Sequence, residues 1–239
     1  AARGCVDVRP GSDPAEVGDE PLLIHLKTSA PVAVGRDRVA AARSLEQFKR
    51  DKRFQVLIGG SRAKVIVAIN NQRKPLDDVR VRRAIAAAID RKSVIDGAVD
   101  GFGVPIGSYY TPGAPGYVDL TAVNAYDPAK ARALLHQAGV QLPLELTMKL
   151  PPTPYARQGG EIIAAMLDKV GIKAKMENIE WAQWLSGVYK DKAYDLTVIA
   201  HVEPLDFGNF ARPGYYWNYD SAQFNALWAS KYKGEADYS

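Results

Sequence analysis

The residues with the clearest chemical potential follow a predicted strand near the C-terminal end of the sequence. Residues 194–200 show the alternation of apolar and polar side chains that is typical of a strand, and His201, Glu203 and Asp206 come directly after it. In an open α/β sheet, ligands bind beyond the carboxyl ends of the strands. Two carboxylates at such a position suit a cationic group such as an α-amine. The alternative is that Asp206 caps a short helical turn over residues 207–210.

A second group of candidate ligand contacts is aromatic. A run of large rings follows the carboxylates, namely Tyr215, Tyr216, Trp217 and Tyr219. Aromatic side chains line many concave ligand sites, so we expect Tyr215 and Trp217 to face a ligand, with packing at a sheet edge as the alternative. Trp181 and Trp184 are different, because they share a predicted helix face with Leu185 and are expected in the core.

Metal and enzyme chemistry find little support in residue types and spacing. The three histidines, His25, His136 and His201, lie far apart, and none has a second His or Cys at ligand spacing, so we expect no metal site. No zinc-protease, nucleophile-elbow or Walker motif occurs, and the glycines at 101 and 103 lack the third glycine of a dinucleotide loop. We therefore expect no cofactor and no enzyme. A hydrolase-like centre around His201, Glu203 and Asp206 is the alternative.

Composition sets broad limits. The chain has 239 residues, of which 47% are hydrophobic and 24% charged, enough to bury a substantial core. The formal charge of +4 is spread along the sequence, so no nucleic-acid partner is expected. The single cysteine, Cys5, excludes an internal disulfide. No apolar run approaches the ~18 residues that a membrane span requires.

Hydrophobic periodicity from residue 64 onward predicts alternating strands and helices. Strands are expected near 64–70, 144–150, 172–176 and 194–200. Helices are expected after Asp77 or Asp78, after Asp90, after Asp127 and around 162–170. The strand, helix and strand from 144 to 176 imply a right-handed crossover and a parallel pair, which favours an α/β fold. Residues 101–115 are expected to form a long irregular loop because they are rich in Gly and Pro.

The first 58 residues carry weaker patterns. Glycine and proline interrupt residues 1–38, where only residues 22–26 look like a strand. A helix is expected over 39–53 and a short strand over 54–58.

One long motif resembles a known family. Residues 70–85 read NNQRKPLDDVRVRRAI and are followed by Asp90-Arg91. This pattern resembles the extracellular solute-binding proteins of family 5, the dipeptide-, oligopeptide- and nickel-binding components of ABC importers. Leu76 stands where the family usually has Phe. The resemblance continues through residues 126–131, 134–139, 171–172 and 194–195 and covers about residues 42–235.

The resemblance implies a fold and a place for each segment. It implies a periplasmic binding protein-like α/β fold (type II, cluster C), whose two lobes close on a solute by hinge motion. Residues 1–74 would then be a partial first-lobe or N-terminal segment that includes the hinge strand, and residues 75–239 a second lobe truncated before its return to the first. Residues 1–38 do not resemble the family and are expected to come from a truncated or rearranged gene. Within the motif, Val79, Val81 and Ile85 are expected to fix the helix to its sheet.

The resemblance also implies a function and a ligand. The chain would be a periplasmic receptor that captures a peptide-like or related small solute and delivers it to ABC transporter permease subunits. In peptide binders of the family, an Asp after the strand matching residues 194–200 pairs with the peptide amine, often after Gly-Trp. This sequence has Ala200-His201 there and is one residue short, so Glu203 or Asp206 takes that role. The alternative is a truncated lobe fragment that folds but no longer binds ligand.

Overall fold

The computed structural model describes residues 5–13, 22–23, 26–27, 32–35, 50, 52, 61–204 and 206–231. The chain divides into two compact units, residues 1–59 and 60–239. In the first unit, β1 (Cys5–Val8) pairs antiparallel with β2 (Val32–Gly35). The strand predicted at residues 22–26 is wrong at Leu22, Leu23 and Leu26, whose backbone is helical, because a short apolar run fits either structure. The elements predicted over residues 39–58 lie outside the described residues apart from Arg50 and Lys52.

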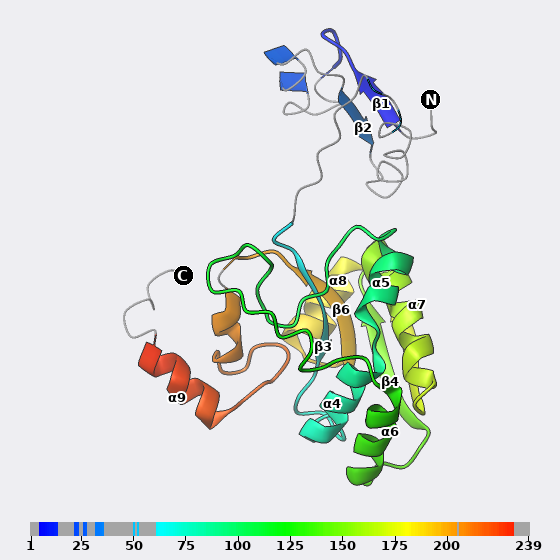
Figure 1. Ribbon diagram of the computed structural model, residues 1–239, viewed down its shortest axis with the longest axis vertical. Helices are drawn as coiled ribbons and strands as arrows, with labels where there is room; N and C mark the ends of the chain where they lie inside the picture. Colours follow the sequence, from blue (N-terminus) through cyan, green and yellow to red (C-terminus); the bar gives the residue numbers. More distant parts are fainter. Residues whose placement is uncertain are drawn as a thin grey trace. The chain divides into compact units, whose positions relative to one another are not determined.

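The second unit is built on a four-stranded sheet in the order β3-β6-β4-β5 (Figure 1). These strands are β3 (Lys64–Ile69), β6 (Leu196–His201), β4 (Leu144–Leu150) and β5 (Ile172–Asn178). β4 runs parallel to both β5 and β6, whereas β3 is antiparallel to β6. The helix α7 (Pro154–Asp168) connects β4 to β5, which confirms the predicted crossover and parallel pair. The carboxyl ends of β4, β5 and β6 therefore share one edge of the sheet.

Helices cover one face of this sheet. They are α4 (Val79–Ala88), α5 (Arg91–Ala98), α6 (Pro128–Gln137) and α7. Asp78, Asp90 and Asp127 cap the first three, each side chain accepting a hydrogen bond from a backbone N–H in the first turn. Beneath them lies the larger apolar core, including Val81, Ile85, Leu135, Met148 and Leu196. Among the described residues, no helix is long and apolar enough to cross a membrane.

The predicted role of Val79 in this core is wrong. Its residue exposure is 45%, whereas Val81 and Ile85 are 0% and 1% exposed. Val81 and Ile85 are four positions apart and share one helix face, but Val79 lies two positions from Val81 and points to nearly the opposite side.

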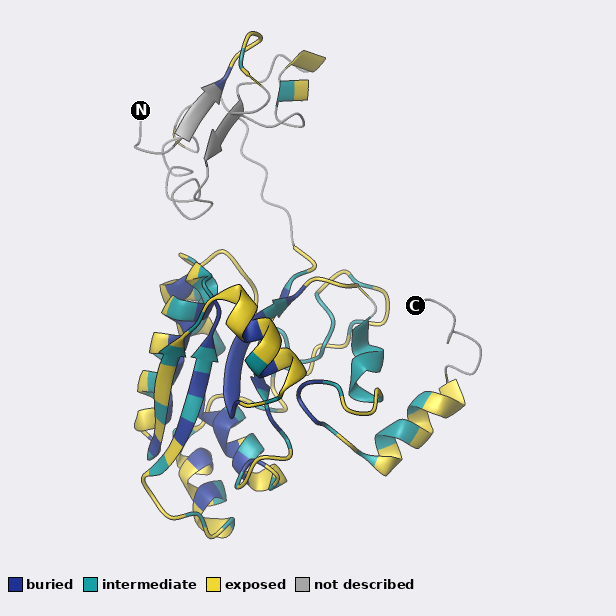
Figure 2. Cartoon of the chain, turned by 180° about the vertical axis from the view of Figure 1, so that it is seen from behind, coloured by how far each residue is buried: buried dark blue, intermediate teal, exposed yellow. Residues whose placement is uncertain are grey.

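An aromatic cluster that includes Trp184, Tyr194, Tyr216 and Trp217 covers the other face of the sheet. The strand β6 is therefore covered on both faces, and nearly all of its residues are buried (Figure 2). Trp184 belongs to this cluster, and its indole N–H donates to the Thr197 hydroxyl at 3.0 Å. The core position predicted for Trp181 and Leu185 is wrong, since both are exposed. The short α8 (Trp181–Gln183) runs into a π-helical segment, η1 (Trp184–Lys190), whose wider turns break the 3.6-residue spacing used for that prediction.

The segment between β3 and α4 is tied to the start of β6. The Asn70 side chain is buried and donates to the backbone oxygens of Lys192 (2.9 Å) and Tyr194 (3.1 Å). Arg73 Nε lies 3.0 Å from Asp195 Oδ1, and the second oxygen of Asp195 accepts from the Thr147 backbone N–H at 2.8 Å. The polar residues of the family motif therefore hold the chain in place where it leaves the sheet.

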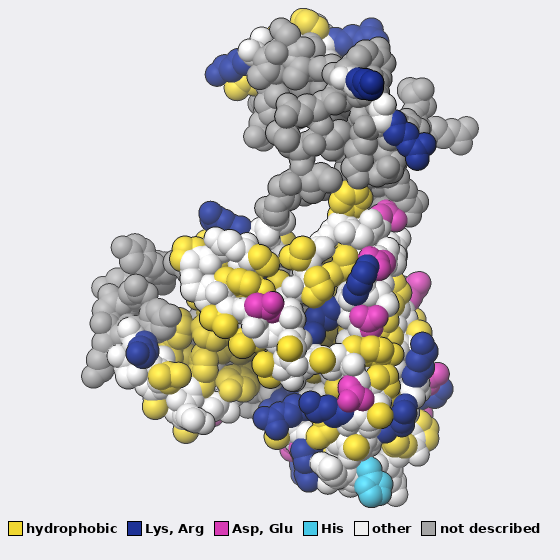
Figure 3. All heavy atoms as spheres, viewed as in Figure 1, with side chains coloured by type: hydrophobic (Ala, Val, Ile, Leu, Met, Phe, Trp, Pro, Cys, Tyr) yellow, Lys and Arg dark blue, Asp and Glu magenta, His cyan; other side chains and the backbone are white. Residues whose placement is uncertain are grey.

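The irregular loop predicted from residue 101 is confirmed and extends to about residue 126. Hydrophobic side chains are exposed on this side of the second unit, as Figure 3 shows. The exposed hydrophobic residues of the loop include Val104, Val118 and Val123. Gly107 packs against the backbone of Leu120 and Thr121 so closely that a methyl group on its Cα would overlap those atoms. A glycine is thus required where the two arms of the loop meet.

We expect Gly107→Ala to destabilise the chain by about 2 kcal/mol, because the backbone of the loop must move apart to admit the methyl group. Urea denaturation followed by tryptophan fluorescence measures this change. Gly187→Ala is the matched control, since only the Lys149 ammonium comes within 4.0 Å of the added carbon. Equal effects of the two substitutions would contradict the close packing of the loop.

Candidate functional site

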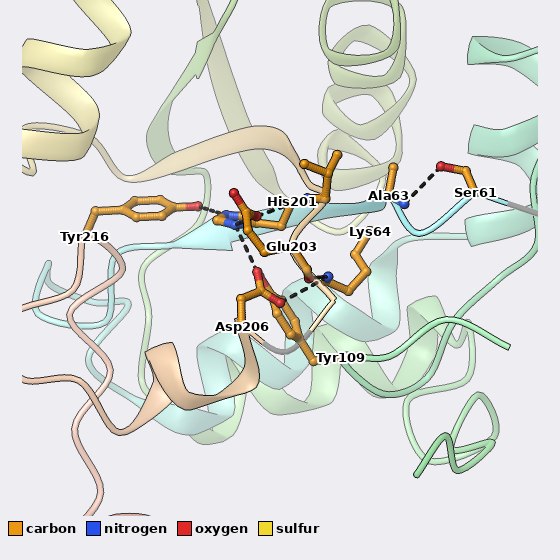
Figure 4. Close-up of polar contacts among 9 residues, drawn as sticks. Ser61, Ala63, Lys64, Tyr109, His201, Glu203, Asp206 and Tyr216 are labelled. Carbon is orange, nitrogen blue, oxygen red and sulfur yellow. Dashed lines mark hydrogen bonds and ion pairs between the residues drawn. The ribbon is translucent and has the colours of Figure 1, made fainter. Parts of the chain in front are cut away.

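The polar site lies where β6 ends and β3 begins (Figure 4). His201 is the last residue of β6 and pairs in register with Lys64, the first residue of β3. The antiparallel register places both side chains on the sheet face that carries the aromatic cluster. Asp206 begins the 3₁₀ segment η2 (Asp206–Phe210), and Tyr109 reaches the site from the long loop. The predicted residues His201, Glu203 and Asp206 are therefore brought together, with Lys64 and Tyr109 added.

Asp206 is the centre of this group, with only 7% of its side chain exposed. Its Oδ1 lies 3.0 Å from Lys64 Nζ, in an ion pair rather than a well-directed hydrogen bond. Its Oδ2 accepts a hydrogen bond from the Tyr109 hydroxyl at 3.2 Å and lies 3.4 Å from His201 Nδ1. Groups of the chain itself thus surround both carboxylate oxygens.

Lys64 is buried as deeply as the residues of the apolar core, with 2% of the residue exposed. Its ammonium group also donates to the Glu203 backbone oxygen at 2.6 Å and lies 5.2 Å from the centre of the Tyr109 ring. Lysine is almost never fully buried without a partner. Sequence reasoning missed this residue, although its position two residues before Ile66 and four before Ala68 places it on the same strand face.

His201 is held between two partners. Its Nε2 lies 2.9 Å from the Tyr216 hydroxyl, and its Nδ1 faces Asp206 and, at 3.9 Å, the Glu203 carboxylate. Burial lowers the pKa of His201, and this effect outweighs the opposing attraction of Asp206 and Glu203. The neutral imidazole can then donate a hydrogen bond from Nδ1 towards Asp206 and accept one at Nε2 from the Tyr216 hydroxyl.

The lowered pKa of His201 predicts that stability falls on acidification. Below the ordinary histidine pKa of 6.5 the unfolded chain takes up a proton that the folded chain does not, so the free energy of unfolding decreases until the pH reaches the folded pKa. His201→Gln is expected to remove this part of the slope between about pH 7 and pH 5. Urea midpoints measured across that range test it.

The control for this experiment is His136→Gln, since His136 is exposed on α6. Its slope is expected to match that of the unsubstituted chain. An unchanged slope in His201→Gln would show that His201 does not carry the effect.

The two predicted aromatic residues lie at different depths. Trp217 is 3% exposed and stacks on Phe210, with ring centroids 4.7 Å apart. Tyr215 is half-buried and packs edge-on against Trp217 at 4.4 Å. Only Tyr215 of this pair therefore has ring surface available at the protein surface.

A pocket of about 570 Å³ adjoins the polar site. Its lining combines the start of β3 with the long loop and the residue after Glu203: Ser61, Arg62, Lys64, Tyr110, Thr111, Pro112, Gly113, Ala114, Pro115 and Pro204. Within the described part of the chain, neither Asp206 nor His201 reaches this lining. Lys64 thus lies between the pocket and the buried carboxylate.

The same cluster has the spacing of a metal site. His201, Glu203 and Asp206 each offer one ligand atom, and these atoms lie within 4.8 Å of one another. The Lys64 ammonium group already lies beside Asp206 and would repel a second cation there. The arrangement therefore suits an internal ion pair better than a metal ion.

Comparison with known proteins decides the family. Residues 38–223 match the family described as bacterial extracellular solute-binding proteins, family 5 Middle. The chain belongs to this family. The family 5 resemblance and the periplasmic binding protein-like α/β fold (type II, cluster C) expected from the sequence are confirmed.

Several similar proteins are named for the peptides that they bind. The chain is 33% identical to a dipeptide-binding protein of Escherichia coli (strain K12) over 146 residues, which are 59% of this chain and 27% of that protein. The solved oligopeptide-binding protein AppA of Bacillus subtilis, in complex with a nonapeptide, superposes with a TM-score of 0.67 at 18% identity, covering 78% of this chain and 42% of that one. The chain thus spans less than half the length of these family 5 proteins.

The first unit is similar to a different family. Residues 1–59 match the family described as tetraacyldisaccharide-1-P 4'-kinase. Over 44 residues the chain is 70% identical to the tetraacyldisaccharide 4'-kinase of Thiobacillus denitrificans, which is 18% of this chain and 13% of that protein. The family 5 match begins only at residue 38, in agreement with the expectation that residues 1–38 depart from that family. The kinase match ends at residue 59, at the boundary between the two compact units.

Proposed function

We propose that residues 75–239 form the second-lobe part of a periplasmic solute-binding protein that captures a peptide-like or related small solute for an ABC importer, and that residues 60–74 contain the hinge strand that leads into it. The observation that carries this proposal is the position of the pocket. It lies beside the end of β6, where ligands bind in open α/β sheets, and a family 5 strand and loop enclose it. Membership of a family of extracellular solute-binding proteins supports the same function. The partners would be the solute and the permease subunits of the importer.

The predicted site residues take different parts in this proposal. Glu203, with 65% of its side chain exposed, and the half-buried Tyr215 would contact the solute from beside the pocket, whose lining includes Pro204 but neither of these two residues. His201, Asp206 and Trp217 are nearly buried and would support those two from behind. We further propose that the crossing between lobes lies at residues 74 and 75, just after the anchored segment that begins at Asn70.

Binding rather than catalysis is proposed for this site. The contacts run from Tyr216 to His201 and from His201 to Asp206, which is the arrangement of a nucleophile, a base and an orienting acid in a catalytic triad. Tyr216, however, is 1% exposed, and burial raises its pKa above the ordinary tyrosine value. A nucleophile must lose its proton and must reach its substrate, and Tyr216 meets neither requirement.

A thermal-shift screen of the full chain with peptides, opines and metal chelates tests the proposal. A solute that binds the native state is expected to raise the Tm, by an amount that grows with the logarithm of one plus the ratio of its concentration to its Kd. Glu203→Gln and Tyr215→Phe then identify whether the shift depends on the proposed contacts. Because one wall supplies only part of a closed cleft, we expect weak binding and screen at millimolar solute.

The alternative is a fragment that folds but binds no solute. It predicts a cooperative unfolding transition whose Tm no solute changes. A shift that survives both substitutions would place the binding site elsewhere on the chain and contradict the proposed contacts.

A further inference from the structure

Lys64 is the one lysine among the described residues that is buried in the core. Its ammonium group meets a carboxylate, a backbone oxygen and the face of a tyrosine ring, all within the chain. These are the kinds of group with which a protein binds the ammonium group of a ligand. The arrangement at Asp206 is therefore that of an ammonium site whose occupant belongs to the chain.

The pairing of β3 with β6 places the Lys64 ammonium group at Asp206. Lys64 and His201 face each other in the β3–β6 register, and His201 Nδ1 in turn faces Asp206. Tyr109 donates to the second oxygen of the same carboxylate. Three elements thus hold Asp206 against Lys64, so the ion pair is pre-organised rather than formed by two mobile surface side chains.

The position of Lys64 also separates Asp206 from solute. Lys64 lines the pocket, and the carboxylate lies behind it. A solute ammonium group approaching from the pocket would have to displace Lys64, which would leave a buried ammonium without its partner. Such an uncompensated buried charge is strongly unfavourable. The pocket side of Lys64 carries Arg62 and the hydroxyls of Ser61 and Thr111, with no acidic side chain among its described lining residues.

We propose that Lys64 is a specificity-determining residue: it occupies the ammonium position at Asp206 from within the chain, so that the pocket takes a neutral or acidic end of a solute. This inference deepens the proposed function and rests on it for the identity of the site as a solute pocket. The occupancy itself can be tested without knowing the solute, by removing the internal ammonium group and supplying one from solution.

The experiment is chemical rescue of two variants of the full chain, each with a probe that matches the size of the group removed. Lys64→Ala removes three carbons and the ammonium group, a space that propylammonium matches. Lys64→Met keeps the length of the stem, with sulfur in place of one methylene, and removes the ammonium group, so the ammonium ion is its probe. Both variants are expected to melt below the unsubstituted chain. At a probe concentration about five times its Kd, the matched probe is expected to raise the Tm by about 2–4 °C.

Controls separate the charge from the bulk of the probe. n-Propanol replaces propylammonium, and sodium replaces ammonium at equal ionic strength; neither is expected to rescue. Adding Asp206→Asn to either variant is expected to abolish the response. Lys64→Met retains nearly all of the buried apolar stem and keeps the test valid where Lys64→Ala does not fold.

Two results would overturn the proposal. One is a propylammonium-dependent rise in the Tm of the unsubstituted chain that Asp206→Asn removes, because the carboxylate would then be open to an external amine. The other is the absence of rescue in Lys64→Met. Failure of the solute screen leaves these rescue results unaffected, so failure of the proposed function and failure of this inference are distinguishable.

Any peptide that does bind in that screen provides a further measurement. Acetylation of its amino terminus is expected to change its affinity by no more than about twofold relative to the unmodified peptide. A loss of tenfold or more on acetylation contradicts the proposal.

Discussion

Replacing Asp206 by Asn is expected to destabilise the chain by about 3–5 kcal/mol, one of the two largest effects that we predict. The substitution preserves shape but leaves the Lys64 ammonium group without its counter-charge, while the residue remains 2% exposed. It also replaces one carboxylate oxygen by an amide nitrogen: either Oδ1, which lies beside Lys64, or Oδ2, which accepts from Tyr109 and faces His201. Chemical denaturation at pH 7 gives the free energy of unfolding.

Glu203→Gln is the matched control for Asp206→Asn. Both carboxylates come from the loop that follows β6, but 65% of the Glu203 side chain is exposed. Its replacement is therefore expected to change stability by no more than about 0.5 kcal/mol. The double variant Lys64→Met with Asp206→Asn is expected to be more stable than the sum of the single effects predicts, because no unpaired charge remains. Additive effects would mean that the two side chains do not interact.

Replacing Asn70 by Ala is the second large effect, with an expected loss of about 3–5 kcal/mol. The Asn70 amide group donates to two backbone oxygens, those of Lys192 and Tyr194, and its own oxygen accepts from the Asn218 side chain at 2.9 Å. The substitution leaves these buried partners without a hydrogen bond, and each unsatisfied buried group costs about 1–3 kcal/mol. Denaturant midpoints measured by circular dichroism provide the comparison.

Two further variants sharpen the Asn70 experiment. Asn70→Asp keeps the acceptor for Asn218 but places a charged oxygen against the two carbonyl oxygens, so it is expected to be at least as destabilising as the alanine variant. Gln72→Ala is the control in the same turn, because the Gln72 side chain is exposed. A small effect of Asn70→Ala would contradict its role as the anchor of the crossing segment.

Much of the second unit was predictable because its elements depend on local patterns. The alternation over residues 144–150 and the Asp-Pro start at residue 127 lead directly to β4 and α6. The predictions that are wrong, at Val79, Trp181 and Leu185, concern residues near helix ends. A residue at a helix end can project past the core, and a π-helical turn changes the spacing between residues that share a face. Hydrophobic periodicity alone predicts neither of these effects.

The candidate site was predictable only in part. His201, Glu203 and Asp206 are neighbours in the sequence, so a strand ending at His201 places them together whatever the rest of the chain does. Lys64 lies 139 residues from Glu203, and nothing in its local sequence marks it as their partner. The aromatic run could likewise be predicted as a group, but not which of its rings would be buried.

The amino-acid sequence by itself determined the α/β class, the order of elements in the second unit and the loop of acidic residues after β6, because each depends on interactions between near neighbours. Only the tertiary structure decided that this loop closes over an internal ammonium group. The antiparallel register of β3 against β6 places Lys64 opposite His201, and such pairing between distant segments depends on the packing of the whole sheet.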